Sequence, residues 1–131
     1  MYLETKEAEF KDLKGATIHS IIINDNKENV TLNTTQGTYI MYHRQDCCES
    51  VELEDVVGDL EDIIGTPVLM AEERVSENKN PDDMLVKDLP EYQDSFTWTF
   101  YEIATVKGSV TLRWYGESNG YYSESVEFFK I

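Results

Sequence analysis

Residues 96–115, FTWTFYEIATVKGSVTLRWY, decide the fold that we expect for this chain. Aromatic residues in the first half alternate with threonines, and the alternation of apolar and polar residues resumes after a short turn. Such alternation is typical of strands with one buried face, and Gly108 supplies the positive φ of a tight hairpin turn. Asn119-Gly120 marks a second hairpin turn before a last strand over residues 121–131. The C-terminal third therefore predicts a three-stranded antiparallel meander with one aromatic and one polar face.

The N-terminal part repeats this pattern in shorter pieces. β-Branched residues fill residues 16–24, and alternation of apolar and polar residues returns over residues 30–33 and 38–43. Short stretches rich in Asp, Asn and Gly separate the three segments, as turn residues do. These residues predict a second three-stranded meander. The pattern is compatible with one curved sheet and with two packed sheets.

The middle of the chain changes period over residues 53–64. Apolar residues recur there at steps of three and one, which is the stripe of an amphipathic helix, and Gly65 with Pro67 would end it. Gly58 lies inside the stripe and leaves open an extended segment over residues 50–55 with a shorter helix. The apolar stripe consists of Leu53, Val56, Val57, Leu60, Ile63 and Ile64. The fold class that follows is α+β, mainly antiparallel β meanders with one principal helix.

The length of 131 residues predicts a single domain over residues 1–131. Residues 1–15 are polar and charged and are expected to form an N-terminal extension. A further strand is expected over residues 68–75, and residues 76–94, rich in Asn, Asp and Pro, predict a long surface loop. The chain has no secretory signal at its start and no apolar run of membrane-spanning length, so we expect a cytoplasmic protein.

The charge of the chain narrows the choice of partners. Eleven basic residues stand against 26 acidic ones, which gives a net charge of −15. Binding to nucleic acid or to an anionic membrane is disfavoured, because phosphate is bound mostly by Lys and Arg. A basic protein is the expected partner, unless the charge serves solubility alone. The partner-binding candidates lie in the expected helix and are Glu54, Asp55, Glu61 and Asp62.

A second candidate stretch is residues 43–49, HRQDCCE, because it gathers side chains of metal-ligand type. His43, Cys47 and Cys48 are the residues on which a metal- or thiol-dependent enzyme would depend. The side chains of adjacent cysteines rarely reach one ion, however, and a disulfide between them would link no distant parts of the chain. The preferred interpretation is structural: Asp46 and Glu49 form a capping box at the start of the helix, and both cysteines are reduced and buried. We therefore expect neither a metal ion nor another cofactor.

The third candidate is the polar face of the C-terminal meander. Its hydroxyl groups and one guanidinium could hold a small anionic or aromatic ligand, such as a nucleotide, unless the face is an ordinary solvated one. The face would collect Thr97, Thr99, Tyr101, Thr111, Arg113 and Tyr115. The ligand-binding candidates are Arg113, Tyr115, Tyr101 and, beside the second turn, Tyr121.

Several sequence blocks are distinctive in their residues and in their order along the chain, among them QDCCESV at residues 45–51, TWTFY at residues 97–101 and RWYGESNGYYS at residues 113–123. In these blocks the chain resembles a family of small uncharacterised proteins of bacteriophages and prophages. The resemblance spans residues 16–131 and implies a phage gene expressed in the cytoplasm of a bacterial host. Small acidic phage proteins often resemble inhibitors of host defence systems that handle nucleic acid.

No phosphate-binding loop, zinc-protease motif or nucleophile elbow occurs in the chain, so nothing supports an enzyme. The expected function is that of a non-enzymatic phage accessory protein whose acidic surface binds and inhibits a basic host protein. Binding or sequestration of a small nucleotide-like ligand around Arg113 is the first alternative. The metal- or thiol-dependent enzyme is the second alternative.

Overall fold

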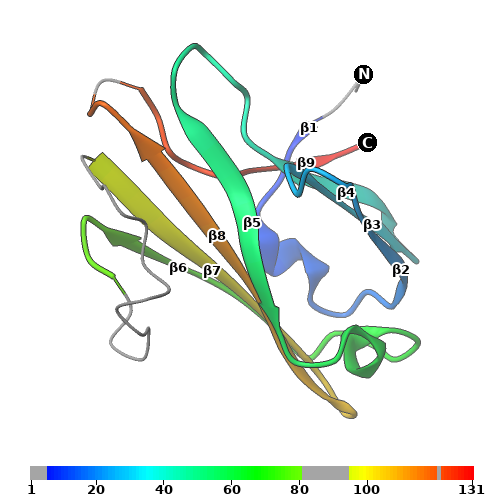
Figure 1. The fold of residues 1–131 in the computed structure, drawn as a ribbon. Helices are drawn as coiled ribbons and strands as arrows, with labels where there is room; N and C mark the ends of the chain where they lie inside the picture. Colours follow the sequence, from blue (N-terminus) through cyan, green and yellow to red (C-terminus); the bar gives the residue numbers. More distant parts are fainter. Residues whose placement is uncertain (1–5, 81–94, 121) are drawn as a thin grey trace.

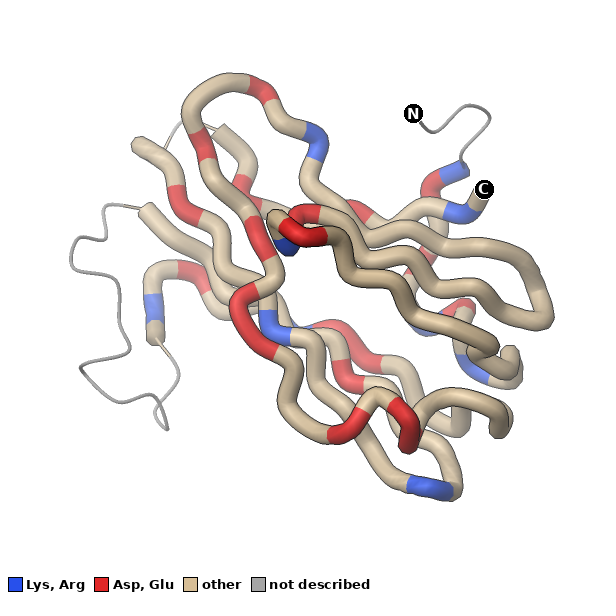
Figure 2. The backbone as a smooth tube through the Cα atoms, turned by 45° about the vertical axis from the view of Figure 1, so that its right-hand side comes forward, with Lys and Arg blue, Asp and Glu red and all other residues tan. Residues whose placement is uncertain are grey.

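In the computed structural model, which describes residues 6–80, 95–120 and 122–131, the chain forms two antiparallel β-sheets packed face to face (Figure 1). The view in Figure 2 shows the two sheets as separate layers. The first sheet has the order β1-β9-β4-β3-β2 and the second the order β5-β8-β7-β6. The alternation pattern was compatible with one curved sheet or with two packed sheets, and the structure has two packed sheets.

Each element has defined bounds. The first sheet contains β1 (Lys6–Glu7), β2 (Ile18–Ile23), β3 (Asn29–Thr34), β4 (Gly37–Tyr42) and β9 (Glu127–Lys130). The second contains β5 (Ser50–Val57), β6 (Met70–Glu77), β7 (Ser95–Thr105) and β8 (Gly108–Ser118). Two 3-10 turns, η1 (Phe10–Leu13) and η2 (Leu60–Ile63), complete the described elements. Among the described residues no α-helix occurs, and no helix is long and apolar enough to cross a membrane.

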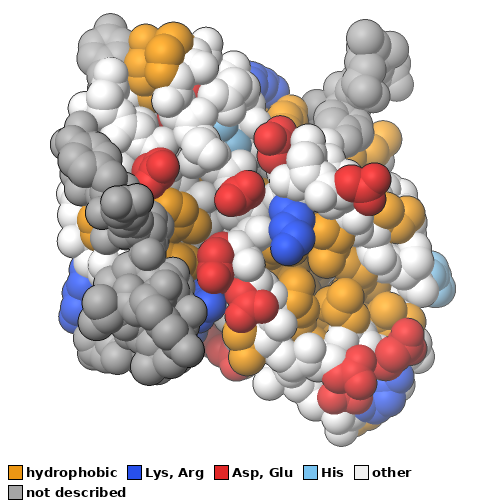
Figure 3. Space-filling view, viewed as in Figure 1, with side chains coloured by type: hydrophobic (Ala, Val, Ile, Leu, Met, Phe, Trp, Pro, Cys, Tyr) orange, Lys and Arg blue, Asp and Glu red, His pale blue; other side chains and the backbone are white. Residues whose placement is uncertain are grey.

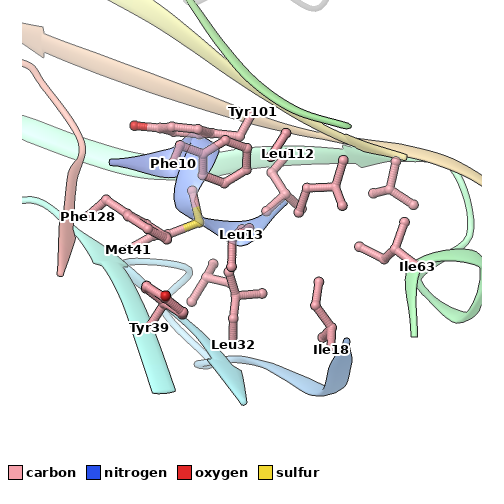
Figure 4. Packing of buried hydrophobic residues seen from close by; sticks show 14 of the residues in the cluster. Phe10, Leu13, Ile18, Leu32, Tyr39, Met41, Ile63, Tyr101, Leu112 and Phe128 are labelled. Atoms are coloured by element: carbon pink, nitrogen blue, oxygen red, sulfur yellow. The ribbon is translucent and has the colours of Figure 1, made fainter. Parts of the chain in front are cut away.

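The hydrophobic core lies between the two sheets, because alternate residues of each strand point inward. Apolar side chains also reach the surface beside β5, on the side of the first sheet (Figure 3). Figure 4 shows Leu32 and Met41 of the first sheet opposite Tyr101 and Leu112 of the second. Phe10, from η1, reaches between the sheets, with its ring centroid 4.6 Å from that of Tyr101. The expected N-terminal extension over residues 1–15 thus contributes part of the core.

The β7–β8 hairpin is confirmed, and its register corrects the expected polar face. Trp98 pairs with Tyr115, and Phe100 pairs with Arg113. Directly paired residues share a face, so Arg113 and Tyr115 lie with the aromatic residues on the outer face. Tyr101 lies on the inner face with Thr97 and Thr99. The six polar residues expected on one face are therefore divided between the two faces.

The expected principal helix is wrong, and with it the α+β class. Residues 50–57 form β5, which pairs with β8, and the register of that pair shifts between Leu53 and Asp55. An extra residue in one strand is a β-bulge, and it lengthens the step between inward positions from two to three. Leu53 and Val56 both pack on the core for this reason, and their spacing imitates a helix. Gly58, at φ +111°, then ends the strand.

The last strand also differs from the expectation. Residues 121–131 were expected to pair with the preceding strand of their own meander, yet β9 lies between β1 and β4 in the other sheet. The β2–β3–β4 meander is confirmed, and the strand expected over residues 68–75 occurs as β6. Of the loop expected over residues 76–94, residues 76 and 77 belong to β6, while residues 81–94 lie outside the described part of the chain.

Candidate functional site

Two adjoining cavities, of about 560 and 420 Å³, lie between the N-terminal segment, β6 and the segment that leads into β9. Both are lined by Glu73, Ser125 and Val126, so they form one groove. We call it the acid-lined groove. Its acidic lining residues are Glu7, Glu9, Glu73, Glu77, Glu124 and Glu127. Lys11 is the one cationic residue among the described residues of the lining.

The floor of the groove is polar and hydrogen-bonded. Glu124 accepts hydrogen bonds from the hydroxyl groups of Thr97, at 2.8 Å, and Ser118, at 2.5 Å. Tyr101 is fully buried, and burial raises the pKa of its phenol, as does its hydrogen bond to Glu73. The phenol therefore stays protonated, and its hydrogen bonds are made to groups of the groove lining itself.

The four acidic residues expected to bind a partner lie in two different places. Both carboxylates at the β5 bulge face Arg113: Glu54 accepts from its Nε at 2.7 Å, and Asp55 lies 3.4 Å from Nη2. This contact neutralises part of their charge. Glu61 and Asp62 lie in η2, where Asp59 caps the turn by accepting a hydrogen bond from the Glu61 backbone N–H. Figures 2 and 3 show acidic positions along β5, and Figure 2 shows them also at η2.

The four ligand-binding candidates do not form one site. Arg113 and Tyr115 lie on the outer face of the second sheet, where the guanidinium lies 5.5 Å from the ring centroid of Trp98. Tyr101 lies on the opposite face, inside the core and beside the acid-lined groove. Tyr121 lies outside the described residues. Because Glu54 and Asp55 occupy the guanidinium, an anionic ligand would have to displace them.

The connection between β4 and β5, residues 43–49, is built around the buried carboxylate of Glu49. His43 Nε2 lies 2.7 Å from one of its oxygens, and His43 Nδ1 lies 2.7 Å from the carbonyl oxygen of Ser125. Both ring nitrogens of His43 are therefore engaged, one with the carboxylate and one with a backbone carbonyl. The backbone N–H groups of Asp46 and Cys47 also donate to Glu49, each at 2.9 Å. The hydrogen bond with His43 is the largest cause that lowers the Glu49 pKa to about 2, and these two N–H groups lower it further.

These contacts bear out half of the capping-box interpretation. The Glu49 side chain accepts from the Asp46 backbone N–H, as a capping box requires, but the strand β5 follows instead of a helix. The cysteines depart from the expectation altogether. Cys47 and Cys48 are exposed and joined by a disulfide, whereas we expected buried thiols.

The geometry gives no support to metal binding around His43. Both of its ring nitrogens are engaged in hydrogen bonds, and both cysteine sulfurs are engaged in the disulfide. Within residues 6–80, 95–120 and 122–131, no group of three or more His, Cys, Asp or Glu side chains is placed to share one ion. The connection instead contains a buried contact between His43 and Glu49 and, next to it in the chain, an exposed disulfide.

Sequence reasoning missed the acid-lined groove. Its residues come from β1, β6 and the segment before β9, which are distant in the chain and belong to two sheets. Glu73, Glu124 and Glu127 stand in alternating or polar stretches with no local signal that distinguishes them. The one available hint was the overall acidic charge.

One comparison with known proteins identifies a family for this chain. A family model described as "Domain of unknown function (DUF7448)" matches residues 11–128, from η1 into β9. No curated protein matches the chain, and no solved structure matches it. The matched region contains β6 and the segment before β9, and so most of the acid-lined groove. The chain therefore belongs to the DUF7448 family, a domain of unknown function.

Proposed function

We propose that this chain is a non-enzymatic binding protein that takes up a basic segment of a partner protein in its acid-lined groove. The observation that carries the proposal is the lining itself: six glutamates surround two joined cavities and meet only Lys11 among the described lining residues. Lys11 is in turn paired with Glu9, at 3.1 Å on the exposed rim. A Lys- or Arg-rich segment complements such a groove.

The negative charge of the chain raises the association rate with a basic partner and also makes the binding selective for it. Complementary potentials raise association rates about 10–1000-fold and weaken steeply with salt. The net charge of −15 extends the attraction beyond the groove, and the acidic residues of β5 and η2 add to it. The acid-lined groove thus serves as the docking point, and the rest of the surface serves to attract the partner.

The setting that we propose is a bacteriophage or prophage. The resemblance of the QDCCESV, TWTFY and RWYGESNGYYS blocks to phage proteins supports it. A basic host protein that binds nucleic acid, such as a component of a defence system, would be inhibited if its nucleic-acid site were occupied by the acidic surface. The same charge disfavours direct binding of nucleic acid by this chain.

The experiment compares two sets of four substitutions that remove the same charge. The groove set is Glu7→Gln, Glu73→Gln, Glu77→Gln and Glu127→Gln. The control set is Glu54→Gln, Asp55→Asn, Glu61→Gln and Asp62→Asn. Binding of an oligolysine peptide is measured by titration calorimetry at low and at physiological salt.

We expect the groove set to weaken binding about tenfold or more at low salt and the control set to weaken it severalfold at most. Equal losses in both sets would show that net charge, without a docking point, binds the peptide. A larger loss in the control set would move the docking point to β5 and η2. No binding by the unaltered chain at low salt would end the proposal.

A further inference from the structure

The two cysteines of the chain form an exposed pair whose role the acid-lined groove does not explain. The chain has two cysteines, and Cys47 and Cys48 are joined in one disulfide. Both residues are exposed, so a reagent in solution reaches them. They lie in the connection that carries the chain from β4 in the first sheet to β5 in the second.

This disulfide contributes little to holding the fold together. A disulfide stabilises mainly by closing a loop in the unfolded chain, and the effect grows with loop length. No residue separates Cys47 from Cys48, and the bond links no distant elements. The connection is held instead by Glu49, whose carboxylate accepts the N–H groups of Asp46 and Cys47 and contacts His43.

The buried contact between Glu49 and His43 fixes the backbone around Cys47 and Cys48. The side chains of Glu49 and His43 are 0 and 4% exposed, so their contact is protected from water, whereas the neighbouring cysteines are exposed. Opening the disulfide therefore leaves the buried network and both sheets in place. A disulfide that is accessible to solvent and contributes little to stability has the properties of one that exchanges with other thiols.

We propose that Cys47 and Cys48 are a redox-active pair that undergoes reversible thiol–disulfide exchange with dithiols, including the paired thiols of reducing proteins. A thiolate of the dithiol attacks one cysteine sulfur, the disulfide bond breaks, and its electron pair leaves on the other cysteine sulfur, which takes up a proton. The second thiol of the reductant, as its thiolate, then attacks the sulfur that the first one contributed to the mixed disulfide; the bond to the cysteine breaks, and the released cysteine sulfur takes up a proton. The products are two cysteine thiols and one oxidised dithiol, with two electrons and two protons transferred.

The first test counts thiols in the folded chain. The full-length protein is equilibrated with reduced and oxidised dithiothreitol in a series of ratios, trapped with an alkylating reagent, and weighed as the intact chain. We expect the chain to carry either no alkyl group or two, with the change completed while circular dichroism still shows the folded β signal. The proposal is overturned if two free thiols persist in the oxidised buffer, or if alkylation requires denaturant.

Single variants supply the matched control. Cys47→Ser and Cys48→Ser each leave one exposed thiol without a neighbour, so oxidised glutathione should leave one glutathione on each variant chain. The unaltered chain should end as the internal disulfide without glutathione, because the neighbouring thiol displaces it. Stable glutathione on the unaltered chain would show that the two sulfurs do not react with each other and would refute the pair.

A second readout locates the change. The chain has two histidines: His43, in contact with Glu49, and His19, exposed in β2. Reduction is expected to shift the NMR signals of the His43 ring, because Cys47 shares Glu49 with it, and to leave those of His19 unchanged. Shifts at both rings would show that the disulfide supports the whole fold and would contradict exchange in a preserved structure.

Discussion

Glu49 is the residue on which the connection between the sheets depends. Its carboxylate accepts hydrogen bonds from two backbone N–H groups and from the His43 ring, and its side chain is fully buried. A carboxylate stabilised in this way gives up its charge only in strong acid. The sequence placed Glu49 correctly opposite the Asp46 N–H, but nothing in it indicated that His43 would complete the pair.

The first prediction concerns Glu49→Gln. We expect a lower urea midpoint of unfolding at pH 7, because an amide has one acceptor oxygen where the carboxylate offers two to the His43 ring and two backbone N–H groups. The pKa is lowered from 4.5 to about 2 in the folded chain, so the contribution of Glu49 is fully present above about pH 4.5 and is lost as the pH falls through about 2. The gap between variant and parent should narrow over that range. Asp46→Asn, an exposed change in the same connection, should leave the midpoint nearly unchanged at every pH.

Arg113 holds the outer face of the second sheet at the bulge. Its side chain is 16% exposed, contacts Glu54 and Asp55, and covers Trp98. The second prediction is that Arg113→Ala destabilises the fold by about 1–3 kcal/mol, because two neighbouring carboxylates lose their shared partner. Arg113→Lys should lose less, since the charge is kept and only the fork geometry is lost. Urea unfolding followed by tryptophan fluorescence checks both, and an unchanged midpoint for Arg113→Ala would contradict a structural role.

At the scale of elements, the strands with strict alternation were predictable, whereas β5 was foreseen only as the open alternative of an extended segment over residues 50–55. Alternation identifies β7 and β8 because every second residue faces the core without interruption. In β5 the bulge between Leu53 and Asp55 changes the spacing, so a strand carries the signature of a helix. A bulge depends on the partner strand and leaves no local signal of its own. The prediction of one polar face was wrong for a related reason: the turn between β7 and β8 sets the pairing register, and the register decides which residues share a face.

The third prediction separates the two interpretations of this segment through Gly58→Ala. In a helix the change would stabilise by about 1 kcal/mol. In the structure Gly58 has φ +111°, and a Cβ atom there would lie 2.7 Å from the Ser109 carbonyl oxygen, so we expect a loss of about 1–3 kcal/mol. Gly15→Ala is the control, because φ is +92° but no atom lies within 4 Å, and its cost should be smaller. Urea unfolding of both variants gives the comparison, and stabilisation by Gly58→Ala would argue against the bulged strand.

At the scale of the whole molecule, charge was predictable and its placement was not. The net charge of −15 follows from composition, whereas the acid-lined groove needs β6, the N-terminal segment and the residues before β9 to meet. Only the tertiary fold brings Glu73 and Glu127 to one groove. Few of the acidic residues in the described part of the chain form ion pairs within 4.0 Å, so most of the repulsion between them is uncompensated.

The fourth prediction follows from this repulsion. Raising the ionic strength from about 0.01 M to about 0.15 M shortens the screening length from about 30 Å to about 8 Å, so the thermal midpoint of unfolding should rise. The groove set of four glutamine substitutions should reduce that rise, because it removes four like charges from one region. Differential scanning calorimetry at the two salt concentrations measures the effect. A midpoint that falls with salt would indicate that the ion pairs outweigh the repulsion.

The position of β9 between β1 and β4 has a consequence for synthesis of the protein. A ribosome makes residues 18–42, and with them three paired strands, long before residues 127–130. Until those four residues emerge, one side of β4 lacks its partner and β1 has nothing to pair with. During that interval the nascent chain carries an open strand edge, and unpaired edges invite association with other chains. Completion of the first sheet therefore waits for residues 127–130, and repulsion between the acidic chains opposes their association until then.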